Sequence, residues 1–194
     1  MRKIHHKYEN PIDNYFIELS DIASPYAYSL GLTPNMITTL SNVACIITIL
    51  LLLNANYYWA ALFFMLSYYF DCLDGYMARK YNMMTSFGDY YDHISDFIKI
   101  FTILATLYYI NPQKFYKVIP IILLVCITSI IHLGCQELLY INNESHSLEL
   151  TKNFCPVKNQ NDIEQIKKTI DITKLFGCGT FNITLVLSII YYDF

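Results

Sequence analysis

The stretch DCLDGYMARKYNMMTSFGDYYDHISD, residues Asp71 to Asp96, carries five aspartates and lies between two apolar runs. The run before it, Tyr57–Phe70, has 14 residues, and the run after it, Ile100–Ile110, has 11. A helix needs about 20 residues to cross a membrane, so each run is too short by itself. Each reaches spanning length only by continuing into the acidic stretch. We therefore expect the aspartates to lie at one membrane face, partly inside the bilayer boundary.

Composition independently indicates a membrane protein. Of the 194 residues, 55% are hydrophobic and 15% are charged, whereas about a quarter of the residues of a soluble domain are charged. The net charge of -3 gives no electrostatic basis for binding nucleic acid. Further apolar runs at Met36–Leu53, 115–139 and 175–192 bring the expected spans to five, or to six if segment 140–174 contains another.

The segment before the first span has the pattern of an amphipathic helix. Asn10-Pro11 predicts a helix N-cap followed by proline at the first helical position. We expect Asp13, Glu18 and Asp21 to occupy the polar side of this helix. The apolar side, at helical spacing, comprises Ile12, Tyr15, Phe16, Leu19, Ile22 and Ala23. Such a helix lies along the membrane surface or packs on the protein's own end, and the residues favour neither arrangement.

The cysteines show no metal-binding or disulfide pattern. There are six of them, scattered without a CxxC pair, and four lie in or beside apolar runs. We interpret them as small hydrophobic residues with reduced thiols.

Lysine and arginine in the loops predict the orientation. Ten lie in the amino-terminal segment, in the loop that contains Arg79, and in segment 140–174, and two lie in the loop at 111–117. The three basic segments, and the acidic stretch with them, should therefore face the cytosol. We expect one all-α integral membrane domain over residues 1–194, with an amino-terminal segment (1–33), catalytic helices (34–110), and the remaining spans and loop (111–194).

The spacing of the aspartates indicates a metal site. Asp71 and Asp74 share one helix face, and Asp89, Asp92 and Asp96 share a face of the next helix. Because the connection between the two helices is short, their acidic faces can meet. Several carboxylates in one pocket repel one another unless cations lie among them, and oxygen ligands suit a hard divalent ion. Two such ions about 4 Å apart would clamp a diphosphate.

The residues around the aspartates complete a pattern. Asp71-x2-Asp74-Gly75-x2-Ala78-Arg79-x8-Gly88-x3-Asp92-x3-Asp96 resembles the signature of the CDP-alcohol phosphotransferases, with all eight fixed positions filled at the correct spacing. Thr33-Pro34-Asn35-x2-Thr38, which opens the first span, is similar to an element that the family places near the nucleotide. Together the matches cover roughly residues 32–96.

The resemblance implies a helical membrane enzyme that cleaves a CDP-linked donor and releases CMP. It implies that Asp71, Asp74 and Asp92 bind two Mg²⁺ or Mn²⁺ ions and that Asp96 is the general base on the acceptor hydroxyl. Other implied roles concern the donor: Gly75 and Ala78 make room for the cytidine, Asn35, Thr38 and Arg79 approach the diphosphate, and Gly88 permits close approach.

Lys99 has no role in the signature. It lies within a span on the same face as Asp92 and Asp96. An unpaired ammonium group there is costly, so we expect it to pair with Asp96 or to bind the acceptor. Snorkelling to the interface is the alternative.

Three other functional interpretations of the aspartates are compatible with the sequence. The aspartates could line the ion path of a cation transporter or channel, a reading that leaves Gly75, Ala78, Arg79 and Gly88 unexplained. They could belong to a solvated helical hairpin, or the chain could be a membrane scaffold without activity.

Within the family, two reactions share the signature. The short chain favours transfer of a phosphatidyl group from CDP-diacylglycerol to a small alcohol. His93 weakly favours transfer of phosphocholine or phosphoethanolamine from its CDP donor to diacylglycerol. We expect the donor, the acceptor alcohol and the lipid bilayer as partners, no nucleic acid, and leave a homodimer open.

Overall fold

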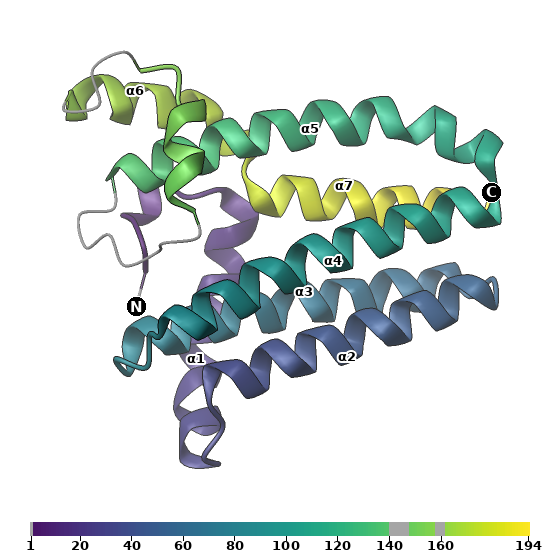
Figure 1. The fold of residues 1–194 in the computed structure, drawn as a ribbon, viewed down its shortest axis with the longest axis horizontal. Coiled ribbons are helices and arrows are strands. Elements are labelled where there is room, and N and C mark those ends of the chain that lie inside the picture. Colours follow the sequence, from purple (N-terminus) through teal and green to yellow (C-terminus); the bar gives the residue numbers. More distant parts are fainter. Residues whose placement is uncertain (1, 140–147, 158–161) are drawn as a thin grey trace.

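The computed structural model describes residues 2–139, 148–157 and 162–194, and these form helices without a strand. The long helices α2, α3, α4, α5 and α7 lie side by side along the longest axis of the molecule, and α1 crosses one end of them (Figure 1). The elements in chain order are η1 (His6–Tyr8), α1 (Pro11–Ser29), α2 (Pro34–Leu53), α3 (Tyr57–Lys80), α4 (Ser86–Ile110), α5 (Pro112–Leu139), η2 (Glu149–Phe154), α6 (Ile163–Thr173), η3 (Lys174–Phe176) and α7 (Cys178–Tyr191).

Four stretches of the described chain are long and apolar enough to cross a membrane. They are Pro34–Leu53, Ser86–Ile110, Pro112–Leu139 and Ile163–Tyr191, the last of which contains α6, η3 and α7. The chain is thus an integral membrane helical bundle, as the sequence predicted. The expected second span, α3, is not among the four; tyrosines interrupt its apolar run, and its carboxyl half carries two aspartates, an arginine and a lysine. Its 24 residues correspond to about 36 Å, enough to cross a bilayer beside α2.

Local signals in the sequence set the helix starts that matter for the site. Thr33 caps α2, where its Oγ1 accepts a hydrogen bond from Met36 N at 3.3 Å. Thr85 caps α4, where its Oγ1 accepts from Gly88 N at 3.0 Å. Asn82 has φ 53, a left-handed conformation that asparagine adopts more readily than most residues. These features make the connection between α3 and α4 short, so the acidic ends of the two helices are neighbours.

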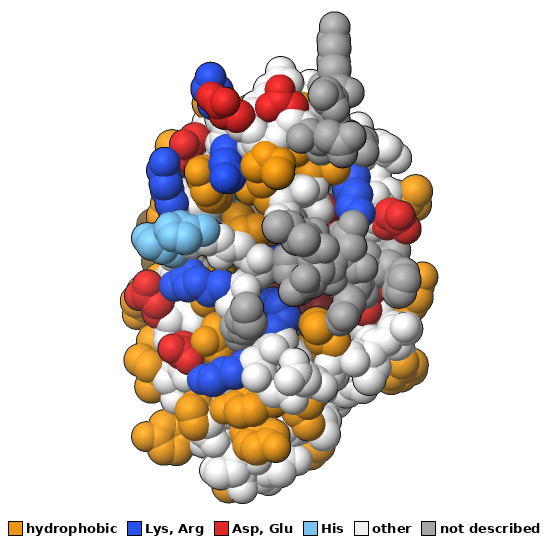
Figure 2. All heavy atoms as spheres, turned by 90° about the vertical axis from the view of Figure 1, so that its left-hand side faces the viewer, with side chains coloured by type: hydrophobic (Ala, Val, Ile, Leu, Met, Phe, Trp, Pro, Cys, Tyr) orange, Lys and Arg blue, Asp and Glu red, His pale blue; other side chains and the backbone are white. Residues whose placement is uncertain are grey.

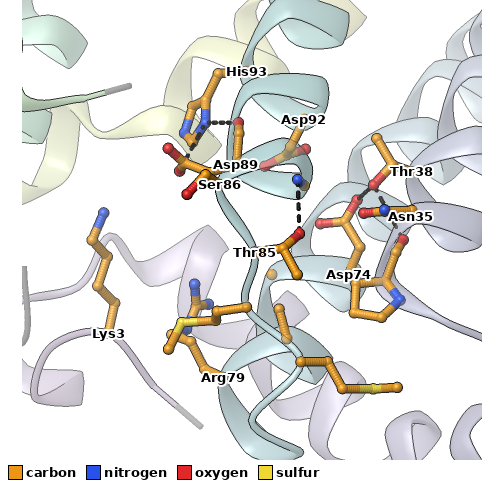
Figure 3. Close-up of a pocket in the computed structure, with 16 residues that line it drawn as sticks. Lys3, Asn35, Thr38, Asp74, Arg79, Thr85, Ser86, Asp89, Asp92 and His93 are labelled. Carbon is orange, nitrogen blue, oxygen red and sulfur yellow. Dashed lines mark hydrogen bonds and ion pairs between the residues drawn. The ribbon is translucent and has the colours of Figure 1, made fainter. Parts of the chain in front are cut away.

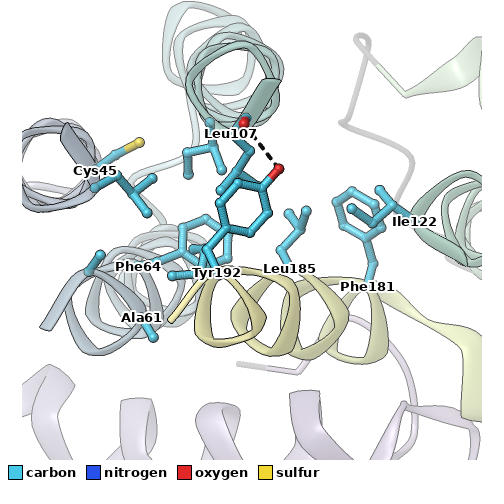
Figure 4. Packing of buried hydrophobic residues seen from close by; sticks show 12 residues of the cluster. Cys45, Ala61, Phe64, Leu107, Ile122, Phe181, Leu185 and Tyr192 are labelled. Atoms are coloured by element: carbon cyan, nitrogen blue, oxygen red, sulfur yellow. Dashed lines mark hydrogen bonds between the residues drawn. The ribbon is translucent and has the colours of Figure 1, made fainter. Parts of the chain in front are cut away.

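A hydrophobic core fills the space among α2, α3, α4, α5 and α7 (Figure 4). Phe64, Leu107 and Leu185 are buried there. At the end of α7, the Tyr192 hydroxyl donates a hydrogen bond to Leu107 O at 3.0 Å, which satisfies the polar tip of a buried ring. The core holds the acidic ends of α3 and α4 at a fixed separation.

The basic segments gather at one end of the bundle, as the orientation argument requires. The amino-terminal segment, the α3–α4 connection and α6 all lie at the left-hand end in Figure 1. Seen from that end, lysine, arginine and histidine side chains are spread among hydrophobic ones (Figure 2). The grouping is therefore confirmed, whereas the compartment that this end faces stays a prediction.

The sequence predicted the start of α1 correctly but placed one of its residues on the wrong side of the helix. Asn10 caps the helix, as expected, and its side chain accepts a hydrogen bond from Ile12 N at 3.0 Å. Asp13, expected on the polar side, is instead buried and accepts a hydrogen bond from the hydroxyl of Tyr68. Helical periodicity alone does not reveal that α3 supplies this hydroxyl. The opposite side of α1 leaves Tyr15 and Ile22 exposed, as a membrane-surface helix would.

The expectation that all cysteines are reduced is also wrong. Cys135 and Cys155 form a disulfide, with 4.9 Å between their Cα atoms. It arises because η2 folds back tightly onto the end of α5: a Cβ on Gly134 would lie 2.2 Å from Thr151 O. The 20-residue separation of the two cysteines matches no motif. The other four cysteines are free.

Candidate active site

Three aspartates from two helices converge at the end of the bundle that carries the basic segments. Asp71 lies on α3, and Asp92 and Asp96 lie one turn apart on α4. One carboxylate oxygen from each of the three falls within 4.8 Å of those of the others, an arrangement that could hold a metal ion. The three- and four-residue spacings place these groups on the helix faces that meet.

Lys99 joins two members of this group. Its Nζ lies 2.7 Å from Asp96 Oδ1 and 3.0 Å from Asp71 Oδ1, and it donates a hydrogen bond to Ser41 Oγ at 2.9 Å. The pair with Asp96 was expected, and the links to α2 and α3 were not. Lys99 is buried, so its ammonium group is fixed between the carboxylates and does not snorkel to an interface.

Asp74 lies on the α2 side of the same region. It is 2% exposed, and its Oδ2 accepts a hydrogen bond from Thr38 Oγ1 at 2.5 Å. The Thr38 hydroxyl on α2 thus orients the carboxylate of a residue on α3 that lies 36 positions later in the sequence. Asp74 is not within the close group formed by Asp71, Asp92 and Asp96.

A cavity of about 360 Å³ opens beside these aspartates (Figure 3). Its walls include eight of the residues selected from the sequence: Asn35, Thr38, Asp74, Gly75, Ala78, Arg79, Gly88 and Asp92. Asp71, Asp96 and Lys99 do not line it. Asp89 and His93 also line it, and His93 Nδ1 lies 2.7 Å from Asp89 O.

One lining residue, Lys3, was missed by sequence reasoning. The amino-terminal segment brings it to the cavity and pairs it with the buried carboxylate of Glu137 on α5. Its distance in sequence from every motif residue leaves no spacing signal that would have pointed to it.

Gly88 allows two helices to approach each other closely at the cavity wall. A Cβ at this position would lie 2.9 Å from Asn35 Oδ1 and 3.0 Å from Thr85 Oγ1. Such contacts require a neighbour to move, so only glycine leaves both the α4 cap and Asn35 in place. At Gly75 the added Cβ would meet only the flexible end of Arg79, at 3.3 Å.

The donor set fits a hard divalent cation. Asp92 Oδ1 is buried and receives no hydrogen bond from any described residue. A buried carboxylate oxygen without a partner is costly, and a cation shared with neighbouring carboxylates would satisfy it. The carboxylates of Asp71 and Asp96 are near enough to share such an ion.

A second buried acidic group lies outside the spans, near the amino terminus. Burial, followed by the charge of Asp13, raises the pKa of Glu9 to about 7, although Gln136 Nε2 donates a hydrogen bond to it at 2.7 Å. Burial likewise raises the pKa of Asp13 to about 6, against the lowering effect of the Tyr68 hydrogen bond. These carboxyl groups have neutral hydrogen-bond partners.

Comparison with known proteins assigns the family. The family model described as CDP-alcohol phosphatidyltransferase matches residues 31–153. The chain belongs to this family. The matched region contains α2, α3 and α4 with all the aspartates of the site, as well as α5 and part of η2.

Curated relatives in the family have a common name. A Rickettsia typhi protein and one from Rickettsia prowazekii are each 43% identical over 67 residues. The match covers 32% of this chain and, respectively, 37% and 36% of the relatives. A Rickettsia felis protein is 56% identical over 36 residues, 19% of this chain and 20% of the relative. All three are named CDP-diacylglycerol–glycerol-3-phosphate 3-phosphatidyltransferase. The chain thus spans about a third of the length of the first two, and no solved structure matches it.

Proposed function

We propose that this protein transfers a phosphatidyl group from CDP-diacylglycerol to a small alcohol and releases CMP. The family, the names of the curated relatives, and the shape of the site support this reaction. The observation that carries the proposal is the meeting of Asp71, Asp92 and Asp96 beside a cavity, with one buried oxygen of Asp92 left without a hydrogen-bond partner.

Asp71, Asp74 and Asp92 would hold two Mg²⁺ or Mn²⁺ ions. When bound, such ions offset the charge of the donor diphosphate and stabilise the departing CMP. Thr38 donates a hydrogen bond that orients Asp74, and the ammonium group of Lys99 fixes the carboxylate of Asp71.

Asp96 would act as the general base. In the reaction the acceptor oxygen forms a bond to the phosphorus of the phosphatidyl group, and the bond from that phosphorus to the oxygen of CMP breaks. The hydroxyl proton passes to the Asp96 carboxylate. The ammonium group of Lys99, 2.7 Å from Asp96 Oδ1, orients that carboxylate and keeps it charged.

The remaining cavity residues would bind the donor. Asn35 and Thr38 on α2 present amide and hydroxyl groups to the cavity, and Arg79 on α3 presents a guanidinium group, whose fork suits phosphate. Gly75 and Ala78 leave space for the cytidine, and Gly88 lets α2 and α4 approach each other.

Product analysis tests this proposal. The purified full chain should release CMP from CDP-diacylglycerol in the presence of Mg²⁺ and an acceptor, and it should form a phosphatidyl lipid. CMP release from CDP-choline or CDP-ethanolamine with diacylglycerol would instead show the aminoalcohol reaction, which the presence of His93 weakly favours. Cation flux through reconstituted vesicles without CMP release would establish a transporter or channel.

We propose that the active site faces the cytosol, because ten of the twelve loop lysines and arginines belong to the three sequence segments that the positive-inside rule assigns to that side. The Cys135–Cys155 disulfide at the same end argues for the opposite side, since disulfides persist mainly in oxidising compartments. The sequon at Asn143, outside the described residues, offers a test. Expressed in a eukaryotic host, the chain should carry no glycan there, and attachment of one would reverse the orientation.

A further inference from the structure

Two serines exchange hydrogen bonds between α2 and α3 inside the bundle. Ser41 Oγ donates to Ser67 O at 2.8 Å, and Ser67 Oγ donates to Ser41 O at 2.9 Å. Both residues are buried, and neither belongs to the aspartate signature. Small residues let membrane helices approach each other closely, so this exchange by itself indicates packing and no chemistry.

Ser41 differs from Ser67 because it also contacts Lys99. Its Oγ accepts a hydrogen bond from Lys99 Nζ at 2.9 Å, whereas Ser67 makes no hydrogen bond to Lys99 in the described structure. A serine hydroxyl has one proton to donate and two lone pairs that accept. Because the Ser41 proton is directed at Ser67 O, the oxygen of Ser41 keeps a lone pair for the ammonium group.

The ammonium group of Lys99 is held by three helices. It lies 2.7 Å from Asp96 Oδ1 on its own helix α4, 3.0 Å from Asp71 Oδ1 on α3, and 2.9 Å from Ser41 Oγ on α2. An ammonium group has three N–H donors, so these contacts use all of them. The lysine stem is flexible, and the position of its charge is therefore set by the three partners.

Neighbouring polar residues of α2 contact the same two acidic helices. Asn42 Nδ2 donates to Ser95 Oγ on α4 at 3.1 Å and to Tyr91 OH at 3.2 Å. Thr38 donates to Asp74 on α3. Polar groups within a membrane span are costly unless they have partners, and α2 is a span that carries none of the aspartates. Its neutral polar residues thus serve the placement of α3 and α4.

Displacement of the Lys99 ammonium group would act mainly on Asp96. Asp71 is a proposed metal ligand, so bound ions would hold it as well, whereas Asp96 is the proposed base. The acceptor hydroxyl must meet a correctly oriented carboxylate, and misplacing a catalytic group by about 1 Å can cost about 10²-fold in rate. The contact of Ser41 with Lys99 therefore bears on proton transfer more than on donor binding.

We propose that Ser41 is a positioning residue of the active site: it holds the ammonium group of Lys99 in the place from which Lys99 orients the Asp96 carboxylate. The inference rests on the proposed function, because it takes Asp96 as the general base. Ser41 does not line the cavity beside the aspartates, so it acts through Lys99 and not by contact with the substrate. The backbone carbonyl of Ser67 directs the Ser41 hydroxyl for this role.

Turnover of a matched pair of variants tests the role. Ser41→Ala removes the contact with Lys99, whereas Ser67→Ala removes only the Ser67 hydroxyl and leaves the backbone carbonyl that Ser41 uses. CMP release is measured in phosphatidylcholine nanodiscs with Mg²⁺, CDP-diacylglycerol and whichever of glycerol 3-phosphate, serine and inositol the wild type accepts.

The two variants should differ in kcat. Ser41→Ala should lower kcat about tenfold and leave the KM for CDP-diacylglycerol within about twofold of the wild type. Ser67→Ala should keep kcat within about twofold of the wild type, because the bond that it loses joins two neutral groups. An equal loss of kcat in both variants would show that the serines only pack α2 against α3, and would overturn the proposal.

A double-mutant cycle with Lys99→Met separates positioning from packing. Without the ammonium group Ser41 has nothing to position, so adding Ser41→Ala to Lys99→Met should change kcat by less than about twofold. A packing role does not depend on Lys99, and the loss caused by Ser41→Ala would then recur in the double variant. That recurrence, or full turnover by Lys99→Met alone, would overturn the proposal.

Thermal unfolding with EDTA repeats the cycle without metal or substrate. The decrease in Tm caused by Ser41→Ala should be smaller in Lys99→Met than in the wild type, because the hydrogen bond to Lys99 is already absent there. If the wild type released no CMP from any donor, the proposed function would be refuted, and this cycle would decide alone. A smaller decrease would still support Ser41 as the residue that positions Lys99, and equal decreases would overturn that assignment as well.

Discussion

Asp71 and Asp96 share the ammonium group of Lys99, whereas Glu9 and Asp13, which are more deeply buried, have only neutral hydrogen-bond partners. Glu9 accepts from Gln136 and Asp13 from Tyr68. Burial raises the pKa of Glu9 to about 7, despite the more distant charges of Arg79 and Lys3, and raises that of Asp13 to about 6. This amino-terminal pair is therefore relieved of part of its charge by taking up protons near neutral pH.

The negative charge of the acidic group on α3 and α4 is compensated in another way. It has a fixed cation in Lys99 and a buried oxygen on Asp92 with no hydrogen-bond partner in the described structure. A divalent cation shared among these carboxylates would satisfy that oxygen. The contrast lies in the partners: the proposed active-site carboxylates have a fixed ammonium group beside them, whereas Glu9 and Asp13 accept hydrogen bonds from neutral groups.

The largest effect on turnover is expected from substitutions in the acidic group on α3 and α4, with Glu9 of the amino-terminal pair as the comparison. Asp96→Asn keeps the side-chain shape but removes the base, so CMP release should fall by at least about 10²-fold while donor and metal still bind. Asp92→Asn should lose Mg²⁺-dependent donor binding as well. Glu9→Gln should leave turnover near that of the wild type.

Donor binding and CMP release, measured side by side, decide between the roles. If Asp96→Asn lost donor affinity as severely as Asp92→Asn, Asp96 would be a metal ligand. The close approach of Asp71, Asp92 and Asp96 makes this outcome chemically sensible, and the base would then have to be another group.

Removing the fixed cation should have the next largest effect. Lys99→Met leaves Asp71 and Asp96 without their ammonium partner, so unfolding without metal should become easier by about 2 kcal/mol. Added Mg²⁺ should then stabilise the variant more than the wild type. Thermal unfolding with EDTA and with Mg²⁺ measures both quantities.

Lys80→Met is the matched control for Lys99→Met. Its ammonium group pairs with Asp21 at 2.7 Å on a partly exposed surface, where an ion pair contributes little. Unchanged turnover and unchanged acceptor KM in Lys99→Met would remove any functional role for Lys99 and leave a structural ion pair.

A smaller effect is expected at the cavity wall. Gly88→Ala places a Cβ 2.9 Å from Asn35 Oδ1, so Asn35 or the α4 cap must move, and donor affinity should fall about tenfold. Gly75→Ala should cost less, because the side chain of Arg79 can shift. Donor titrations of the two variants compare the sites, and an equal loss at both would show that a rigid contact is not the cause.

The smallest effect concerns the amino-terminal pair and its pH dependence. The pKa of Glu9 rises from 4.5 to about 7 on folding, so between these values the folded state binds more protons than the unfolded state. Stability should therefore fall as the pH rises from about 4.5 to about 7 and then level off. Glu9→Gln should flatten this slope in thermal unfolding, leaving the contribution of Asp13 below pH 6. An unchanged slope would show that Glu9 is not its source.

Local sequence determined much of this protein. The three- and four-residue spacing of the aspartates fixes which of them share a helix face, since that depends only on helical periodicity. Asn10, Thr33 and Thr85 cap helices through contacts within three residues. The short apolar runs likewise predicted that α3 and α4 must extend through the acidic stretch, and both do.

Tertiary packing alone decided which residues meet across helices. Lys99 was expected near Asp96, one turn away, but its contacts with Asp71 and Ser41 span 28 and 58 residues. The burial of Asp13 depends on Tyr68, and the disulfide depends on η2 folding back onto α5. The ion pair of Lys3 with Glu137 joins residues 134 positions apart. Such contacts depend on how helices are placed relative to one another, which hydrophobic packing over the whole core sets and no local spacing encodes.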